Sequence, residues 1–189
     1  ALTIRSVPGR EDLTPIAYAP ETAFPGHPDD AIDAIQPGDV VVLDGRGVTD
    51  EGLFGDLLTL RMKTQGAAGS VSDMGVRDSS RILKTGLPTF SRGPCSPGGS
   101  VYNVDFNVPI GCAGVLVCPG DVISADDDGT IVIPAAMTPP IAEQVMEHED
   151  REDFIRIQLG QGAPLQGLYP MGEEWEARFR AWRLQELGR

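Results

Sequence analysis

Alternating and clustered hydrophobic positions predict the elements of the first half of the chain. Apolar and polar residues alternate over residues 1–7, and an apolar run fills residues 39–44, so both stretches predict strands. Leucines at helical spacing predict a helix over residues 53–65, followed by a strand over residues 70–73 and a short helix over residues 77–83. This strand, helix, strand, helix order indicates a layered α/β domain with a central β unit.

The second half changes to short strands separated by turn residues. Strands are predicted over residues 115–118, 122–124 and 130–133, each beside glycine, proline or aspartate. The Asp-Asp-Asp-Gly run at residues 126–129 predicts a tight turn between two of these strands. It is a poor calcium loop, because the further ligands and the closing glutamate of an EF-hand are missing.

Two helices are predicted near the end of the chain, over residues 140–159 and 173–187. Trp175, Phe179 and Trp182 recur at helical spacing on the second of them. Such an aromatic stripe most often fills a core or a subunit contact. We therefore expect this helix to pack on its own domain or on a neighbouring subunit.

Composition excludes several classes of partner. The chain of 189 residues, 41% of them hydrophobic, is long enough for one compact domain. Its net charge of -13 and the lack of a basic patch disfavour nucleic acid and anionic membrane surfaces, and no apolar run could cross a bilayer. Cys95, Cys112 and Cys118 show no Cys-x-x-Cys spacing, which disfavours disulfides and structural zinc and favours buried, reduced thiols in the cytoplasm.

The strongest chemical signal is Gly55-Asp56 followed, after twenty residues, by Arg77-Asp78. If the strand before Asp78 lies beside the helix that begins near Asp56, these residues meet at one edge of the sheet. The backbone amides of residues 55–58 would then attract a carboxylate or a phosphate, and Arg77 offers a planar fork of donors. The two aspartates are hard oxygen ligands suited to Mg²⁺ or Mn²⁺. The same residues are also compatible with ordinary helix starts and a surface ion pair.

Three longer stretches carry a family resemblance: residues 69–78, 107–112 and 119–134. They are similar to the family that joins RraA-like proteins with class II pyruvate aldolases, and the similarity extends from residue 1 to about residue 162. Met74 stands where the family usually has glycine.

The resemblance implies a layered α/β/β/α swivelling-domain fold with a central β unit, formed by a single RraA-like domain over residues 1–189. It further implies a C-terminal helical extension over about residues 163–189. The N-terminal helices of the family are not found before the first strand, so we expect a preceding segment to be missing.

The resemblance also implies roles for site residues. The aspartate matching Asp78 binds Mg²⁺ or Mn²⁺ directly, the arginine matching Arg77 holds the pyruvate unit and stabilises its enolate, and the acid matching Asp56 orients metal-bound water. Amides matching those of Gly55, Asp56, Leu57 and Leu58 complete the substrate cradle.

A further acid is implied from a neighbouring subunit. In the family, a glutamate on a C-terminal helix holds metal-bound water; Glu152 is the candidate here, with Glu149 as the second choice. This implies a homotrimer, or a dimer of trimers, with sites between subunits.

Three functions are compatible with the sequence. The first is a metal-dependent lyase that forms a pyruvate enolate, by retro-aldol cleavage of a 4-hydroxy-2-keto acid or by decarboxylation of oxaloacetate. The second is a non-catalytic regulator that binds and inhibits an RNA-degrading endonuclease. Asp56 favours the enzyme, because the regulators of the family tend to lack this acid. A relative that acts on a sugar-acid derivative is the third possibility.

Overall fold

A computed structural model describes residues 1–9, 28–98 and 101–188 of the chain. The chain divides into two compact units, Ala1–Ala135 and Ala136–Arg189.

The N-terminal unit is built on a five-stranded sheet with the order β4-β3-β2-β1-β5. Its strands are β1 Leu2–Pro8, β2 Val40–Leu43, β3 Gly69–Ser72, β4 Thr89–Phe90 and β5 Val101–Phe106. The first four strands run parallel, and β5 pairs antiparallel with β1. The strand predicted over residues 39–44 is thus confirmed as β2, which is nearly continuously apolar because both faces of the sheet are covered.

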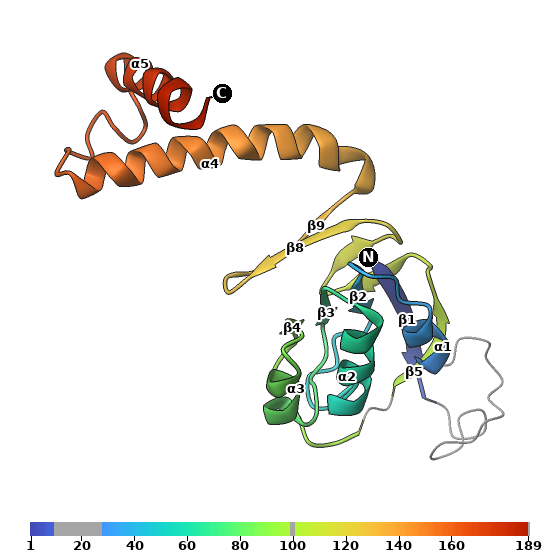
Figure 1. Cartoon of the computed structure of the whole chain (residues 1–189). Coiled ribbons are helices and arrows are strands. Elements are labelled where there is room, and N and C mark those ends of the chain that lie inside the picture. Colours follow the sequence, from blue (N-terminus) through green and yellow to red (C-terminus); the bar gives the residue numbers. More distant parts are fainter. Residues whose placement is uncertain (10–27, 99–100, 189) are drawn as a thin grey trace. The chain divides into compact units, whose positions relative to one another are not determined.

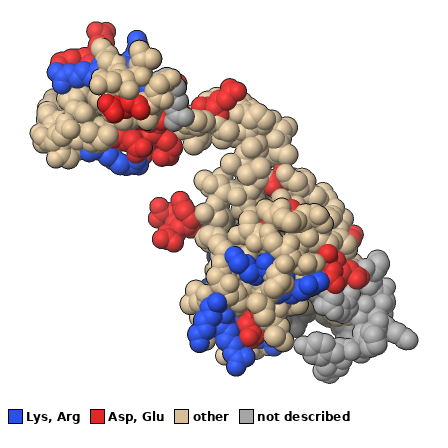
Figure 2. Space-filling model, in the orientation of Figure 1, with Lys and Arg blue, Asp and Glu red and all other residues tan. Residues whose placement is uncertain are grey.

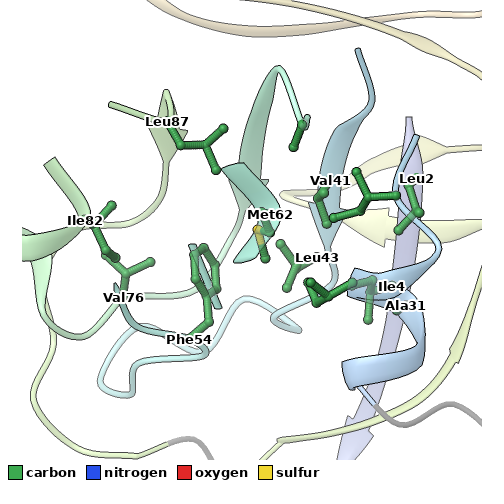
Figure 3. Packing of buried hydrophobic residues seen from close by; sticks show 13 residues of the cluster. Leu2, Ile4, Ala31, Val41, Leu43, Phe54, Met62, Val76, Ile82 and Leu87 are labelled. Atoms are coloured by element: carbon green, nitrogen blue, oxygen red, sulfur yellow. The ribbon is translucent and has the colours of Figure 1, made fainter. Parts of the chain in front are cut away.

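Helices cover one face of this sheet (Figure 1). They are α1 Pro28–Asp33, α2 Asp56–Gln65 and α3 Ser79–Thr85. Apolar side chains from the sheet and from all three helices form one buried cluster between the two layers (Figure 3); it includes Leu2, Ile4, Val41, Leu43, Ile32, Met62 and Ile82. This cluster fixes the start of α2 and of α3 against the sheet.

Two antiparallel strand pairs lie on the other side of the unit. They are β6 Ile110–Cys112 with β7 Val115–Val117, and β8 Val122–Asp126 with β9 Gly129–Ile133. A second cluster packs Val42 of the sheet against Ile110, Cys112 and Val117. The order of layers within this unit is therefore helices, central sheet and small β pairs.

The turn between β8 and β9 confirms the sequence prediction. The Oδ1 atom of Asp126 accepts hydrogen bonds from the backbone N–H groups of Asp128 at 2.9 Å and Gly129 at 3.3 Å. An aspartate that accepts from residues two and three positions ahead stabilises a tight turn.

The C-terminal unit is a helical hairpin. It contains the 3₁₀ turn η1 Ala135–Met137 at its boundary, α4 Thr138–Gly160, α5 Glu173–Trp182 and a π-helical end, η2 Arg183–Leu187. Phe154, Leu168 and Phe179 form its buried core, and Trp175 and Trp182 pack at the edge. The aromatic stripe therefore packs within its own unit, which is one of the two outcomes expected. No helix in the described ranges is long and apolar enough to span a membrane.

Candidate functional site

The first half of the candidate site is the start of α2. Gly55 has an extended backbone, with φ -132° and ψ -161°, and α2 begins at Asp56. The carbonyl oxygen of Gly55 accepts from the N–H of Thr59 at 3.2 Å and from its hydroxyl at 2.9 Å. Leu58 packs on the core, whereas the side chain of Leu57 is exposed. The free N–H groups of a first helical turn can hold an anion.

The second half of the site is the start of α3. Asp78 precedes this helix in the left-handed backbone region, with φ 52° and ψ 33°, a conformation that aspartate tolerates better than most residues. Its carbonyl accepts from the N–H groups of Arg81 at 2.7 Å and Ile82 at 3.0 Å. The carboxylate does not cap the helix. The backbone of Asp78 thus starts the helix, whereas its carboxylate makes no capping bond to the helix.

The structure brings these two halves together, as the sequence predicts. The N–H of Arg77 donates to the carbonyl of Phe54 at 2.9 Å, which joins the two segments directly. A Cβ atom built on Gly55 would lie only 2.5 Å from Oδ2 of Asp78. The carboxylate of Asp78 therefore lies against the start of α2, in space that any larger residue at position 55 would occupy.

The three charged side chains at this point differ in exposure and in their bonding partners. Asp56 is half-buried, and its Oδ2 lies 3.5 Å from Nη1 of Arg81. Arg77 and Asp78 are exposed. Within the described part of the chain, neither of these two side chains has a hydrogen-bond or ion-pair partner. Both are therefore available to a ligand.

A polar pocket of about 430 Å³ opens beside these groups. It is lined by Val76, Arg77, Asp78, Ser79, Ser80, Pro94, Cys95 and Ser96. A larger pocket of about 710 Å³ lies between the sheet and the small β pairs, and valine and isoleucine side chains form much of its wall. We place the candidate site at the smaller pocket, because unpaired groups of both charges converge there.

The local charge around the site differs from the acidic average of the chain. Helices α2 and α3 carry the basic residues Arg61, Lys63, Arg81 and Lys84. Figure 2 shows Lys and Arg side chains over this part of the N-terminal unit, while acidic side chains project at the tip of the β8–β9 pair. Lys63 and Lys84 lie in the last turns of these helices, whereas Arg61 and Arg81 are paired with Asp33 and Asp56.

The donor set suits a magnesium-like ion more than zinc. In the described residues, no group of three or more His, Cys, Asp and Glu side chains could hold a metal. Mg²⁺ needs fewer protein ligands, because it keeps several waters and binds through one or two carboxylates and the substrate. Asp78 fits that requirement with its unpaired carboxylate, which lies against Gly55, and Asp56 follows Gly55 directly in the chain.

Two buried acids near the sheet escaped the sequence analysis. Asp73 follows β3; its Oδ1 accepts from the N–H of Gly45 at 2.7 Å, and its Oδ2 accepts from the N–H of Ala113 at 3.0 Å. Burial raises the pKa of Asp44, assisted by the nearby charge of Asp73 and opposed by the hydrogen bond from the N–H of Arg46. In the sequence, only their position at the ends of strands distinguishes these two acids from others. Their bonds hold loops together.

The candidate glutamates lie in the other unit. Glu152 is on α4, where its Oε2 is 2.5 Å from Nη2 of Arg156 and its Oε1 is 3.5 Å from Nδ1 of His148. Glu149 is an exposed residue of the same helix. The N-terminal unit that contains Arg77 and Asp78 includes neither of them.

Comparison with known proteins identifies the family. The chain belongs to the RraA-like family, because the family profile, described as Aldolase/RraA, matches residues 1–132. Protein DlpA of Legionella pneumophila is 32% identical over 137 residues, which is 71% of this chain and 22% of that protein. A protein of Halalkalibacterium halodurans named "Putative 4-hydroxy-4-methyl-2-oxoglutarate aldolase" is 39% identical over 99 residues, 52% of this chain and 47% of that protein. The chain thus spans less than half of either relative.

The fold has solved counterparts. The crystal structure of RraAS2 from Streptomyces coelicolor, described as an unusual member of the RNase ES inhibitor RraA protein family, superposes with a TM-score of 0.71 at 32% identity. That match covers 82% of this chain and 73% of the other. The mixed α/β fold expected from the sequence is therefore confirmed as the RraA fold.

Proposed function

We propose that this protein is a divalent-metal-dependent lyase that forms a pyruvate enolate. Its substrates would be 4-hydroxy-2-keto acids, cleaved by a retro-aldol reaction, or oxaloacetate, which loses carbon dioxide. The observation that carries the proposal is the contact of the Asp78 carboxylate with the Gly55 position, beside the unpaired guanidinium of Arg77. The relatives named as aldolases support the same reaction class.

Arg77 is the group that would bind the reacting end of the substrate. Its planar fork matches a carboxylate, and its positive charge stabilises the oxygen that becomes negative as the enolate forms. In the retro-aldol reaction the bond between C3 and C4 breaks, and its electron pair moves to C3, conjugated with the C2 carbonyl. In the decarboxylation the bond between C3 and the C4 carboxylate breaks in the same way. One site can therefore serve both reactions.

Asp78 and Asp56 would hold the divalent ion, Asp78 directly and Asp56 through water. When bound, Mg²⁺ or Mn²⁺ supplies Lewis-acid polarisation of the keto oxygen. The N–H groups at the start of α2, from Gly55 to Leu58, orient the carboxylate end of the substrate. Asp56, through an ordered water, would accept the proton of the C4 hydroxyl and return a proton to C3 of the enolate.

The first experiment measures pyruvate release from oxaloacetate and from 4-hydroxy-4-methyl-2-oxoglutarate with Mg²⁺, Mn²⁺ or EDTA. We expect metal-dependent release by the wild type. Asp78→Ala and Asp78→Asn should abolish it, and the second variant is the cleaner one because asparagine tolerates the left-handed backbone at this position. Arg77→Ala should lower kcat by about 10²–10³-fold while metal affinity is kept.

Asp127→Asn is the matched control, because it removes one negative charge from the exposed β8–β9 turn. Equal turnover in Asp78→Asn and Asp127→Asn would contradict the site assignment.

A regulator is the alternative function, and the similarity to RraAS2, a member of an RNase inhibitor family, favours it. Such a protein would bind its partner without turning over a keto acid. If pyruvate release in the first experiment does not exceed the metal-only background, the regulator becomes the favoured function. Asp56 favours the enzyme, because the regulators of the family tend to lack this acid.

The enzyme would act as a homotrimer or a dimer of trimers in which Glu152 of a neighbouring subunit completes the site. Glu152 is bonded to Arg156 within its helix, so it would exchange this partner for water at the metal site. Mixing inactive Asp78→Asn subunits with inactive Glu152→Gln subunits should restore part of the activity, since some sites would then combine two intact halves. Glu143→Gln, an exposed change on the same helix, is the control and should remain active. No recovery after mixing would contradict a shared site.

A further inference from the structure

Three backbone segments meet beside Arg77, and hydrogen bonds join them. Leu53 donates its N–H to the carbonyl of Gly75 at 2.9 Å, and Gly52 donates to the carbonyl of Pro97 at 2.9 Å. On the other edge, the N–H of Cys95 donates to the carbonyl of Val76 at 2.8 Å. The segment that carries Arg77 is therefore paired on both sides, and its backbone has little freedom to move.

The stem of Arg77 lies directly over Gly52. A Cβ atom built on Gly52 would be 2.5 Å from Cγ of Arg77, 3.0 Å from the carbonyl oxygen of Cys95 and 3.1 Å from the N of Arg77. Gly52 is buried, and its φ lies outside the left-handed region that favours glycine. The structure therefore requires glycine at this position for space and not for backbone conformation.

A methyl group at position 52 could not be absorbed by a small adjustment. Two of its three contacts would be backbone atoms, which the paired segments hold in place. The third is Cγ of Arg77, an atom near the root of the side chain, so its displacement turns the whole stem and moves the guanidinium. Spreading the segments would lengthen the hydrogen bonds that join them. The segments also pack closely at Gly75, whose own Cβ position would lie 2.8 Å from Cβ of Cys95 and 2.8 Å from the carbonyl oxygen of Glu51.

We infer that Gly52 is a positioning residue, which directs the guanidinium of Arg77 toward the carboxylate of a keto-acid ligand. The inference rests on the proposed function in one respect, namely that Arg77 binds this carboxylate. Gly52 would thus be a further residue that determines anion binding, outside the Gly55-Asp56 and Arg77-Asp78 pairs. Gly52 touches no ligand and acts only through the direction of the Arg77 stem.

The test compares Gly52→Ala with Gly98→Ala. Gly98 forms a backbone bridge with Gly52, yet a Cβ atom built on it meets nothing within 4 Å. Pyruvate and oxalate binding would be measured by calorimetry in Mg²⁺, with Mn²⁺ affinity measured separately. We expect Gly52→Ala to weaken binding of both anions by about tenfold or more, as a misplaced group does, and to leave Mn²⁺ affinity unchanged. Gly98→Ala should bind like the wild type.

A double-mutant cycle separates positioning from general damage. In an Arg77→Ala background, Cγ is gone, so Gly52→Ala should have little further effect on anion binding. An equal loss in both backgrounds, or an equal loss in Gly98→Ala, would overturn the inference.

Crystal structures of the two glycine variants keep the inference separate from the proposed function. A turned Arg77 stem in Gly52→Ala alone supports positioning, and an unmoved stem overturns it, whether or not the wild type turns over a keto acid. Absent turnover in the wild type counts only against the proposed function.

Discussion

At the residue scale, burial raises the pKa of two side chains in the N-terminal unit, those of Asp44 and Cys112. Asp44 and Cys112 both lie near Asp73, and desolvation is the largest cause of the raised pKa of each. Burial raises the pKa of the Cys112 thiol to about 11, with the negative charge of Asp73 acting in the same direction. Asp44 should therefore make the stability of the N-terminal unit depend on pH, and Cys112 should react slowly with thiol reagents.

Asp44 should make stability fall as pH rises. Its pKa is raised in the folded state, so above the ordinary value of the carboxyl the folded chain binds more protons than the unfolded chain. Its contribution is therefore most favourable at low pH and is lost as pH rises through the raised pKa. Asp44→Asn keeps Oδ1 as an acceptor for the N–H of Arg46 and removes the charge.

Urea unfolding should accordingly show Asp44→Asn gaining stability over the wild type at pH 7, and the gain should disappear near pH 3. The exposed change Asp127→Asn is the control. A difference between Asp44→Asn and the wild type that stays constant with pH would contradict the prediction.

Cys112 should be the last of the three cysteines to react with iodoacetamide at pH 8. It is buried and its pKa is about 11, whereas Cys95 and Cys118 are partly exposed, and the thiolate is the reactive form. Labelling followed by peptide mapping gives the order. In urea the three should label at similar rates, and early native labelling of Cys112 would show that this core opens readily.

At the element scale, the end of α2 depends on one glycine. Gly66 has φ 94°, and a Cβ atom built on it would lie 3.1 Å from Cα of Pro37. Gly86 ends α3 with φ 70° but has nothing within 4 Å of its Cβ position. Gly86→Ala should therefore cost about 1–2 kcal/mol for the left-handed backbone alone. Gly66→Ala should cost about 1–3 kcal/mol more, because it also overpacks against Pro37.

The comparison of these two variants by urea unfolding isolates the contact with Pro37. Equal losses of unfolding free energy in the two variants would show that the loop before β2 moves aside at little energetic cost.

Elements were predictable where local pattern and tertiary contacts agree. The predicted helix over residues 53–65 begins three residues later, at Asp56, because Leu53 pairs with Gly75 across the chain instead of continuing the helix. Strand β5 escaped detection, since all its side chains are partly buried and no alternation results. Spacing and helix patterning identified both halves of the candidate site. The close packing of Gly52 and Gly55 against the second half depends on contacts between distant segments and left no local signal.

At the scale of the whole molecule, the two units have separate cores. The apolar clusters of the N-terminal unit contain no residue of the helical hairpin, whose core is Phe154, Ile155, Leu168 and Phe179. A core of this size gives a unit of about fifty residues only marginal stability. Aromatic packing is concentrated on Phe154, whose ring centroid lies 5.6 Å from that of Trp182 and 5.8 Å from that of Phe179.

The units should therefore unfold in separate transitions, and the chain provides a probe for each. Both tryptophans, Trp175 and Trp182, lie in the hairpin, so tryptophan fluorescence reports on that unit alone. Pulsed labelling of Cys112 reports on the core of the other unit. Phe154→Ala should cost the hairpin about 3–5 kcal/mol and so lower the fluorescence midpoint in urea or abolish this transition, while the Cys112 midpoint stays in place. If both midpoints moved together, the two units would form one cooperative structure, and the hairpin would contribute to the stability of the candidate site as well as to the proposed subunit contact.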